Sequence, residues 1–86
     1  MVGFVVFQAG SAILGVGATP AAAIEDAARN LGPGGILSSV AEAPRSGGLV
    51  AGALYVAPAD DVVRAAVERD GGGIDYQIVG GRVVLA

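Results

Sequence analysis

Residues 18–36 read ATPAAAIEDAARNLGPGGI, and residues 56–74 read VAPADDVVRAAVERDGGGI. Aligned without a gap, the two stretches share a proline (Pro20 and Pro58), an Ala-Ala pair and a closing Gly-Gly-Ile. Proline fits the first turn of a helix because its missing N–H is not needed there, and glycine commonly ends a helix. The two stretches therefore predict two helices of similar build. A duplicated unit and a coincidence between two Ala-rich helices both explain the match.

The first predicted helix is amphipathic. Thr19 is a suitable N-cap before Pro20, because its hydroxyl can accept a backbone N–H. The apolar residues recur at i, i+3, i+4 and i+7, namely Ile24, Ala27, Ala28 and Leu31. The opposite side carries Glu25, Asp26, Arg29 and Asn30. Glycines at 32, 34 and 35 end this helix.

The second predicted helix opens at Pro58 and ends at the glycine run 71–73. Asp60 and Asp61 lie in its first turn, where the helix dipole favours negative charge. Its apolar stripe consists of Ala59, Val62, Val63, Ala66 and Val67.

Strands are predicted around the helices, at residues 2–8, 12–16, 36–41, 49–56, 74–79 and 82–85. The last two pair across Gly80-Gly81, a two-glycine hairpin turn. The resulting order, β-β-α-β-β-α-β-β, predicts a single α+β domain over residues 1–86. We expect an antiparallel sheet with two helices on one face. If the unit is duplicated, its β-α-β-β-α-β centre corresponds to a ferredoxin-like core with one extra strand at either end.

Composition bears on partners and location. The chain is 53% hydrophobic and only 15% charged, against about 25% charged in an average domain. Some apolar surface should therefore be buried between chains, and we expect a homodimer. The uncharged N-terminal stretch is interrupted by glycines and is too broken for a membrane helix. We expect a cytoplasmic protein that contacts no membrane, with a cleaved signal peptide as the alternative.

Several kinds of chemistry are excluded. The net charge is −3 and the five basic residues, all arginines, are scattered, so we expect no direct nucleic-acid binding. The absence of cysteine and histidine rules out disulfides, zinc sites of the usual type and a Ser-His-Asp triad. Asp60 and Asp61 are neighbours on a helix and point apart, so they cannot share a metal or a proton. We expect no enzyme activity, no cofactor and no metal.

Two loops are candidate binding sites. GVGATP (15–20) lies between a predicted strand and helix, as a phosphate-binding loop would, but it lacks the third glycine and the Gly-Lys-Ser/Thr of the known fingerprints. Its glycines are explained as a turn into a capped helix, with an anion at the helix N-terminus as the alternative. Arg45, in the loop PRSGG, is a candidate contact with a partner.

The stretch GATPAAAIEDAARNL (17–31) resembles the strand–helix segment of HicB-type antitoxins. In that family a Gly-x-Thr opens a helix with small or apolar residues four, eight and twelve positions after the Thr, as at Ala23, Ala27 and Leu31. The resemblance implies neutralisation of a small basic toxin. In size, acidity and lack of cysteine, the chain also resembles small inhibitors encoded by phages, including anti-CRISPR proteins. That resemblance implies inhibition by occupying a surface of a larger complex.

We therefore expect a non-catalytic inhibitor that acts by protein–protein contact and blocks a nucleic-acid-binding surface of a bacterial defence complex. The alternatives are a HicB-like antitoxin and an oligomeric module that binds a small molecule or an anion through residues 15–19. If both helices cover the same face, their acidic residues form one surface that could oppose a basic partner. The candidate contact residues are Glu25, Asp26, Asp60, Asp61, Glu68 and Asp70, together with Arg45.

Overall fold

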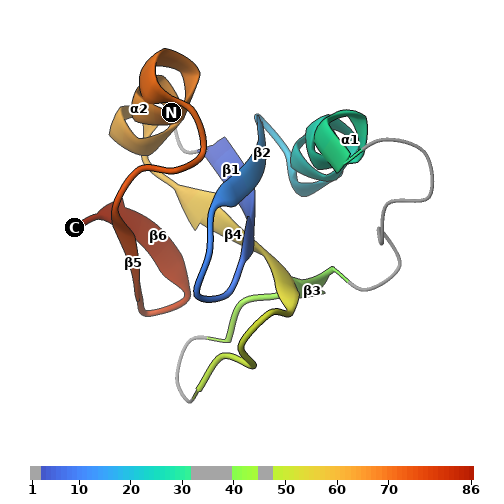
Figure 1. The fold of residues 1–86 in the computed structure, drawn as a ribbon, viewed down its shortest axis with the longest axis vertical. Coiled ribbons are helices and arrows are strands. Elements are labelled where there is room, and N and C mark those ends of the chain that lie inside the picture. Colours follow the sequence, from blue (N-terminus) through green and yellow to red (C-terminus); the bar gives the residue numbers. More distant parts are fainter. Residues whose placement is uncertain (1–2, 32–39, 45–47) are drawn as a thin grey trace.

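A computed structural model describes residues 3–31, 40–44 and 48–86 of the chain. These residues form a small α+β domain whose elements follow the predicted β-β-α-β-β-α-β-β order (Figure 1). The elements are β1 (Gly3–Gln8), β2 (Ile13–Gly17), α1 (Pro20–Leu31), β3 (Ala41–Glu42), β4 (Leu54–Ala59), α2 (Asp61–Asp70), β5 (Tyr76–Val79) and β6 (Arg82–Leu85). The fold class predicted from the sequence is confirmed.

The six-stranded sheet is mixed, which corrects the expected antiparallel sheet. Its strand order is β2-β1-β4-β6-β5, and β3 pairs with β4 outside this path. β1 pairs antiparallel with both β2 and β4. β6 instead runs parallel to β4, with Ala59 opposite Val83, because α2 and β5 intervene and return the chain in the same direction.

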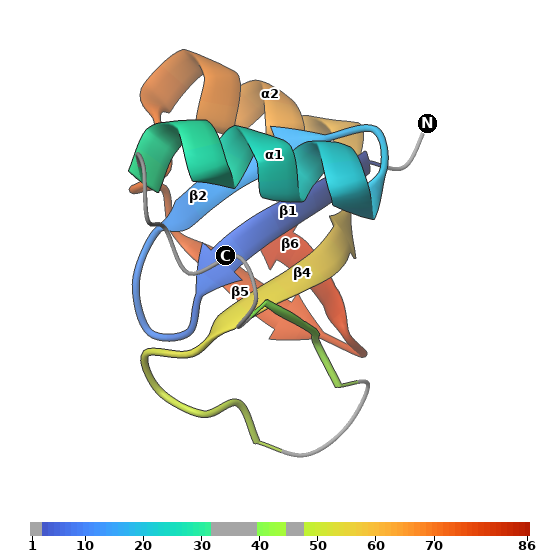
Figure 2. The ribbon, with the colours of Figure 1, turned by 90° about the vertical axis from the view of Figure 1, so that its right-hand side faces the viewer.

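The two helices cover opposite faces of the central strands, in contrast to the expected arrangement on one face and to the ferredoxin-like core that a duplicated unit would give. Successive residues of a strand point to opposite faces. On one face, Val6 of β1 packs with Ala23 and Ala27 of α1. On the other face, Val5 packs in a cluster that includes Val63 of α2. In Figure 2, α1 lies in front of β1 and β2, whereas α2 lies behind α1 at the top of the view.

The start of α1 follows the sequence prediction. The Thr19 hydroxyl accepts a hydrogen bond from Ala22 N–H at 3.1 Å, so Thr19 caps the helix that Pro20 begins. The helix then lies directly on β2 at Gly15 and Gly17. A Cβ added at Gly15 would collide with the backbone of Ala27. These glycines are therefore required for close helix–strand packing.

The segment before α2 differs from the prediction. Pro58 does not open the helix but lies inside β4, opposite Phe4 of β1. The helix begins at Asp61, and Asp60 N-caps it without a side-chain hydrogen bond. The two prolines that coincide in the sequence thus occupy different structures.

Strand limits also shift in the middle of the chain. The predicted strand 49–56 is observed only from Leu54 onward. Of the predicted strand 36–41, Ala41 belongs to β3, while residues 36–39 lie outside the described ones. The predicted glycine stop at 32–35 also lies outside them.

Candidate functional site

The predicted acidic surface is divided by the fold. Glu25 and Asp26 belong to α1, whereas Asp61, Glu68 and Asp70 belong to α2. Because the two helices lie on opposite faces, these carboxylates do not form the single outward surface expected from the sequence.

Several of the predicted contact residues have partners inside the chain. Asp60 forms an ion pair with Arg82 of β6, and Asp70 pairs with Arg69 at 3.0 Å. Glu25 and Glu68 are exposed. Arg45 lies outside the described residues.

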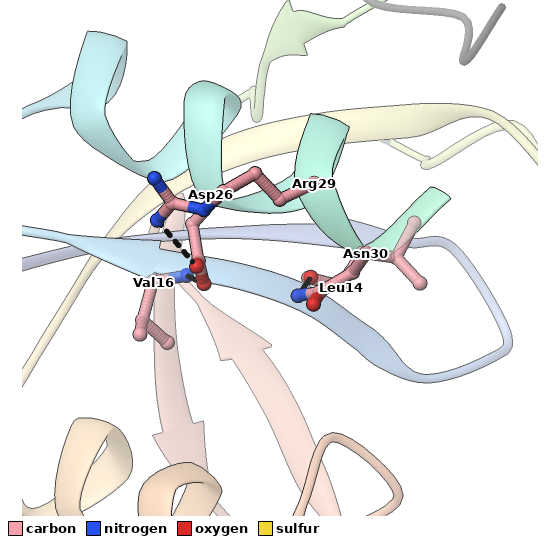
Figure 3. A network of polar contacts seen from close by, with 5 residues as sticks. All are labelled: Leu14, Val16, Asp26, Arg29 and Asn30. Atoms are coloured by element: carbon pink, nitrogen blue, oxygen red, sulfur yellow. Dashed lines mark hydrogen bonds and ion pairs between the residues drawn. The ribbon is translucent and has the colours of Figure 1, made fainter. Parts of the chain in front are cut away.

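Asp26 is bound to the edge strand β2. Its Oδ2 accepts the backbone N–H of Val16 at 3.0 Å, and its Oδ1 accepts Arg29 Nη2 at 2.9 Å (Figure 3). The Val16 N–H lowers the pKa of the Asp26 carboxyl, partial burial opposes this shift, and Arg29 lowers the pKa further. One turn later, Asn30 donates to the carbonyl oxygen of Leu14 at 2.6 Å.

The outer edge of β2 is therefore engaged at three points. Side chains of α1 occupy Val16 N–H and Leu14 C=O. At the start of the strand, Ile13 N–H donates to Gly72 C=O at 2.8 Å. Gly72 approaches so closely that an added Cβ would collide with the Ile13 carbonyl. Closing an edge in this way prevents another strand from adding there.

The other end of the sheet is β5, which pairs only with β6 among the described strands. A two-residue hairpin turn joins residues that exchange both hydrogen bonds, here Val79 and Arg82. Bonded and non-bonded pairs alternate along an antiparallel ladder. This alternation predicts that the backbone groups of Asp75 point toward Ala86. The structure agrees, because Ala86 N–H donates a hydrogen bond to Asp75 C=O at 3.4 Å. The backbone N–H and C=O groups of Tyr76 and Ile78 consequently point away from β6, toward the free edge.

An open groove of about 580 Å³ lies beside this edge. We call it the β5 groove. It is lined by Phe7, Gly10, Ser11, Ala12, Leu49 and residues 73–78.

The floor of the β5 groove is aromatic and held by hydrogen bonds. The ring of Phe7 lies 5.7 Å from those of Tyr55 and Tyr76. The Tyr76 hydroxyl donates to the carbonyl of Ser11 at 2.6 Å, which ties β5 to the β1–β2 turn. Burial raises the pKa of this hydroxyl. The Tyr55 hydroxyl accepts Val50 N–H at 2.9 Å, which holds the loop that places Leu49 on the groove.

Sequence reasoning did not identify the β5 groove, although one signal was present. Ile74, Tyr76 and Ile78 alternate with Asp75, Gln77 and Val79. This period of two marks a strand with one covered face and one open face, and the half-buried and exposed residues alternate accordingly in the structure. The signal does not reveal that β5 is an edge strand.

A second cavity, of about 400 Å³, lies on β4 between β3 and the β5–β6 turn. Its lining combines apolar residues with two charged side chains, Glu42 and Arg82. Arg82 is already engaged by Asp60, so the charge offered by this cavity is partly neutralised.

The candidate anion loop, residues 15–19, is partly covered by α1, and Ala18 and Thr19 are exposed. Gly15 and Gly17 are buried strand residues against α1, which takes the space beside their backbone.

No metal-binding cluster defines a site in the part of the chain that the structure describes. No group of three or more His, Cys, Asp or Glu side chains there could hold a metal ion. No helix among these residues is long and apolar enough to cross a membrane. The β5 groove is the candidate site that combines a cavity with the edge strand of the described sheet. Comparisons of the chain with protein-family models, curated proteins and solved structures find no match.

Proposed function

We propose that this chain is a non-catalytic protein-binding domain that takes up an extended segment of its partner as an additional strand along β5. The proposal rests on one observation, that the two edge strands of the sheet differ in what lies beside them. β2 is closed by Asp26, Asn30 and Gly72, whereas β5 ends the strand order beside an open groove.

Strand addition obtains its affinity from main-chain hydrogen bonds and its selectivity from alternating side chains. The outward backbone groups of Tyr76 and Ile78 supply the hydrogen bonds. Leu49 and Ile78 supply apolar surface along the groove, above the fully buried ring of Phe7. Binding of this kind needs no catalytic group.

The narrower function that we propose is inhibition, by blocking a nucleic-acid-binding surface of a bacterial defence complex. Neutralisation of a small basic toxin is the alternative. The net charge of −3 supports a basic target in both cases. A homodimer remains our expectation from the low charge content and exposed apolar side chains such as Val62, which is 63% exposed on α2.

A proline substitution in β5 tests the proposal. Ile78→Pro removes one outward N–H and leaves the ladder to β6 intact, because proline is tolerated where a strand's N–H faces outward. Ile78→Val shortens the side chain by one methylene but keeps the N–H, and it is the control for the loss of apolar side-chain volume. Circular dichroism verifies that both variants fold.

Each variant is used to capture partners from cells alongside the parent chain. We expect a partner that the parent and Ile78→Val retain and Ile78→Pro loses. Its identity, a nucleic-acid-binding complex or a small basic toxin, then distinguishes the two narrower functions. Capture that is equal for all three chains would show that the β5 edge is not the contact.

A further inference from the structure

The two faces of β5 offer different chemistry to a strand that adds along it. The half-buried residues Ile74, Tyr76 and Ile78 all pack against the main core cluster. A strand that pairs with β5 places its inward side chains next to these residues and to Leu49. Inward positions of the bound segment therefore require apolar side chains.

The opposite face of β5 carries Gln77 and Val79, and Asp75 directly precedes the strand on the same side; all three residues are exposed. Asp75 is the charged residue among those that line the β5 groove. The guanidinium of Arg82, which lies on the same hairpin, forms an ion pair with Asp60. The exposed side of residues 75–79 thus presents negative charge beside the groove.

The position of Asp75, one residue before the β5–β6 ladder, strengthens this preference. Its own backbone bonds toward Ala86, on the β6 side. Toward a strand that adds antiparallel on the other edge, Asp75 is consequently a non-hydrogen-bonded position, where the side chains of opposing strands approach most closely. Opposite charges on directly opposing residues stabilise a strand pair, and like charges destabilise it.

We infer that the segment bound along β5 alternates apolar residues with polar ones and carries a lysine or arginine directly opposite Asp75. This inference rests on the proposed strand addition and names the chemistry of the segment. The occupant is an extended, basic segment of a partner protein rather than a second copy of this chain.

Two synthetic peptides with blocked ends test the inference. Both alternate valine with threonine, and one central threonine is replaced by lysine in the first peptide and by glutamate in the second. Binding is measured by isothermal titration and by shifts of the β5 amide signals in NMR spectra. We expect the lysine peptide to bind about two- to fivefold more tightly, because an exposed cross-strand ion pair contributes modestly. The difference should shrink as salt is raised.

Protein variants locate the charge effect. Asp75→Asn removes the carboxylate without changing the backbone and should abolish the preference for lysine. Glu68→Gln is the matched control, since it removes one exposed carboxylate on α2 and changes the net charge equally. It should leave the preference intact. Equal loss in both variants would assign the effect to net charge and overturn the inference.

The remaining outcomes separate the inference from the proposed function. Equal binding of both peptides, with shifts at β5, would overturn the basic segment and leave strand addition standing. If neither peptide shifts the β5 amide signals at about 1 mM, any dissociation constant is above the millimolar range. That result would overturn both the basic segment and the strand addition. A dimer of the parent chain that Ile78→Pro dissociates and Ile78→Val retains would show that a second copy occupies the edge, which also overturns the inference.

Discussion

Replacing Asp26 tests whether this carboxylate serves the fold rather than a partner. Asp26 joins α1 to the edge of β2 through Val16 N–H and also holds Arg29. Asp26→Asn keeps an oxygen acceptor but removes the charge. Asp26→Ala removes both, and leaves Val16 N–H to water. We expect both changes to destabilise the domain.

The magnitude follows from the contacts. A hydrogen bond to a charged group contributes about 1.5–3 kcal/mol, and the Asp26 side chain is 27% exposed, which favours the lower end. The Arg29 side chain is 73% exposed, so the ion pair adds at most about 0.5 kcal/mol. Alanine recovers roughly 0.5 kcal/mol because it is a better helix former than Asp. The expected cost is about 1–2 kcal/mol for Asp26→Ala and about 0.5–1 kcal/mol for Asp26→Asn.

Urea unfolding followed by circular dichroism measures these costs, and Glu25→Gln is the matched control on the exposed side of α1. A loss of 1 kcal/mol should lower Tm by about 4–8 °C in a domain of this size. The control should change stability by less than about 0.5 kcal/mol. An equal loss for Glu25→Gln and Asp26→Asn would refute the assigned role of Asp26.

The pH dependence has a definite sign. The pKa of Asp26 is lowered in the folded chain, so its contribution is fully present above the unfolded value of about 3.9. The contribution is lost as pH falls through the lower folded pKa. The stability difference between the parent and Asp26→Asn should therefore vanish in strong acid. A difference that persists unchanged there would contradict the hydrogen-bonded carboxylate.

The other predictions concern packing, association and nucleic acid. Gly15→Ala should lower the free energy of unfolding by about 1–3 kcal/mol, since the new Cβ must displace α1. In the control Gly73→Ala, the new Cβ meets no neighbouring atom. Equal unfolding midpoints for the two variants would contradict the close packing. Light scattering at micromolar concentration should return the mass of a homodimer, and a monomer mass across that range would exclude it. Gel-shift assays should detect no binding to bare duplex DNA or RNA at physiological salt, because the chain carries a net charge of −3; a salt-sensitive shift tighter than roughly 10⁻⁶ M would refute this.

Local features of the sequence were sufficient for much of the fold. Thr19 and Pro20 start α1, and Gly80-Gly81 closes the last hairpin, because capping and turn geometry depend on a few neighbouring residues. The order of helices and strands follows from hydrophobic periodicity for the same reason. Pro58 is an exception, since its place in β4 depends on pairing with Phe4, far away in the chain.

The candidate site depended on long-range pairing instead. Asp26 has the sequence pattern of a solvent-facing helix residue, and only the packing of α1 over β2 brings it to Val16 N–H. Likewise, the alternation in residues 74–79 predicts a strand but does not say which strand lies beside it. The order β2-β1-β4-β6-β5 makes β5 an edge. By itself, the sequence determined the elements, their order and the chemistry that is excluded, since these depend on composition and near neighbours. Only the tertiary structure decided which face each helix covers and which strand lies at the edge of the described sheet, because both depend on contacts between residues distant in the chain.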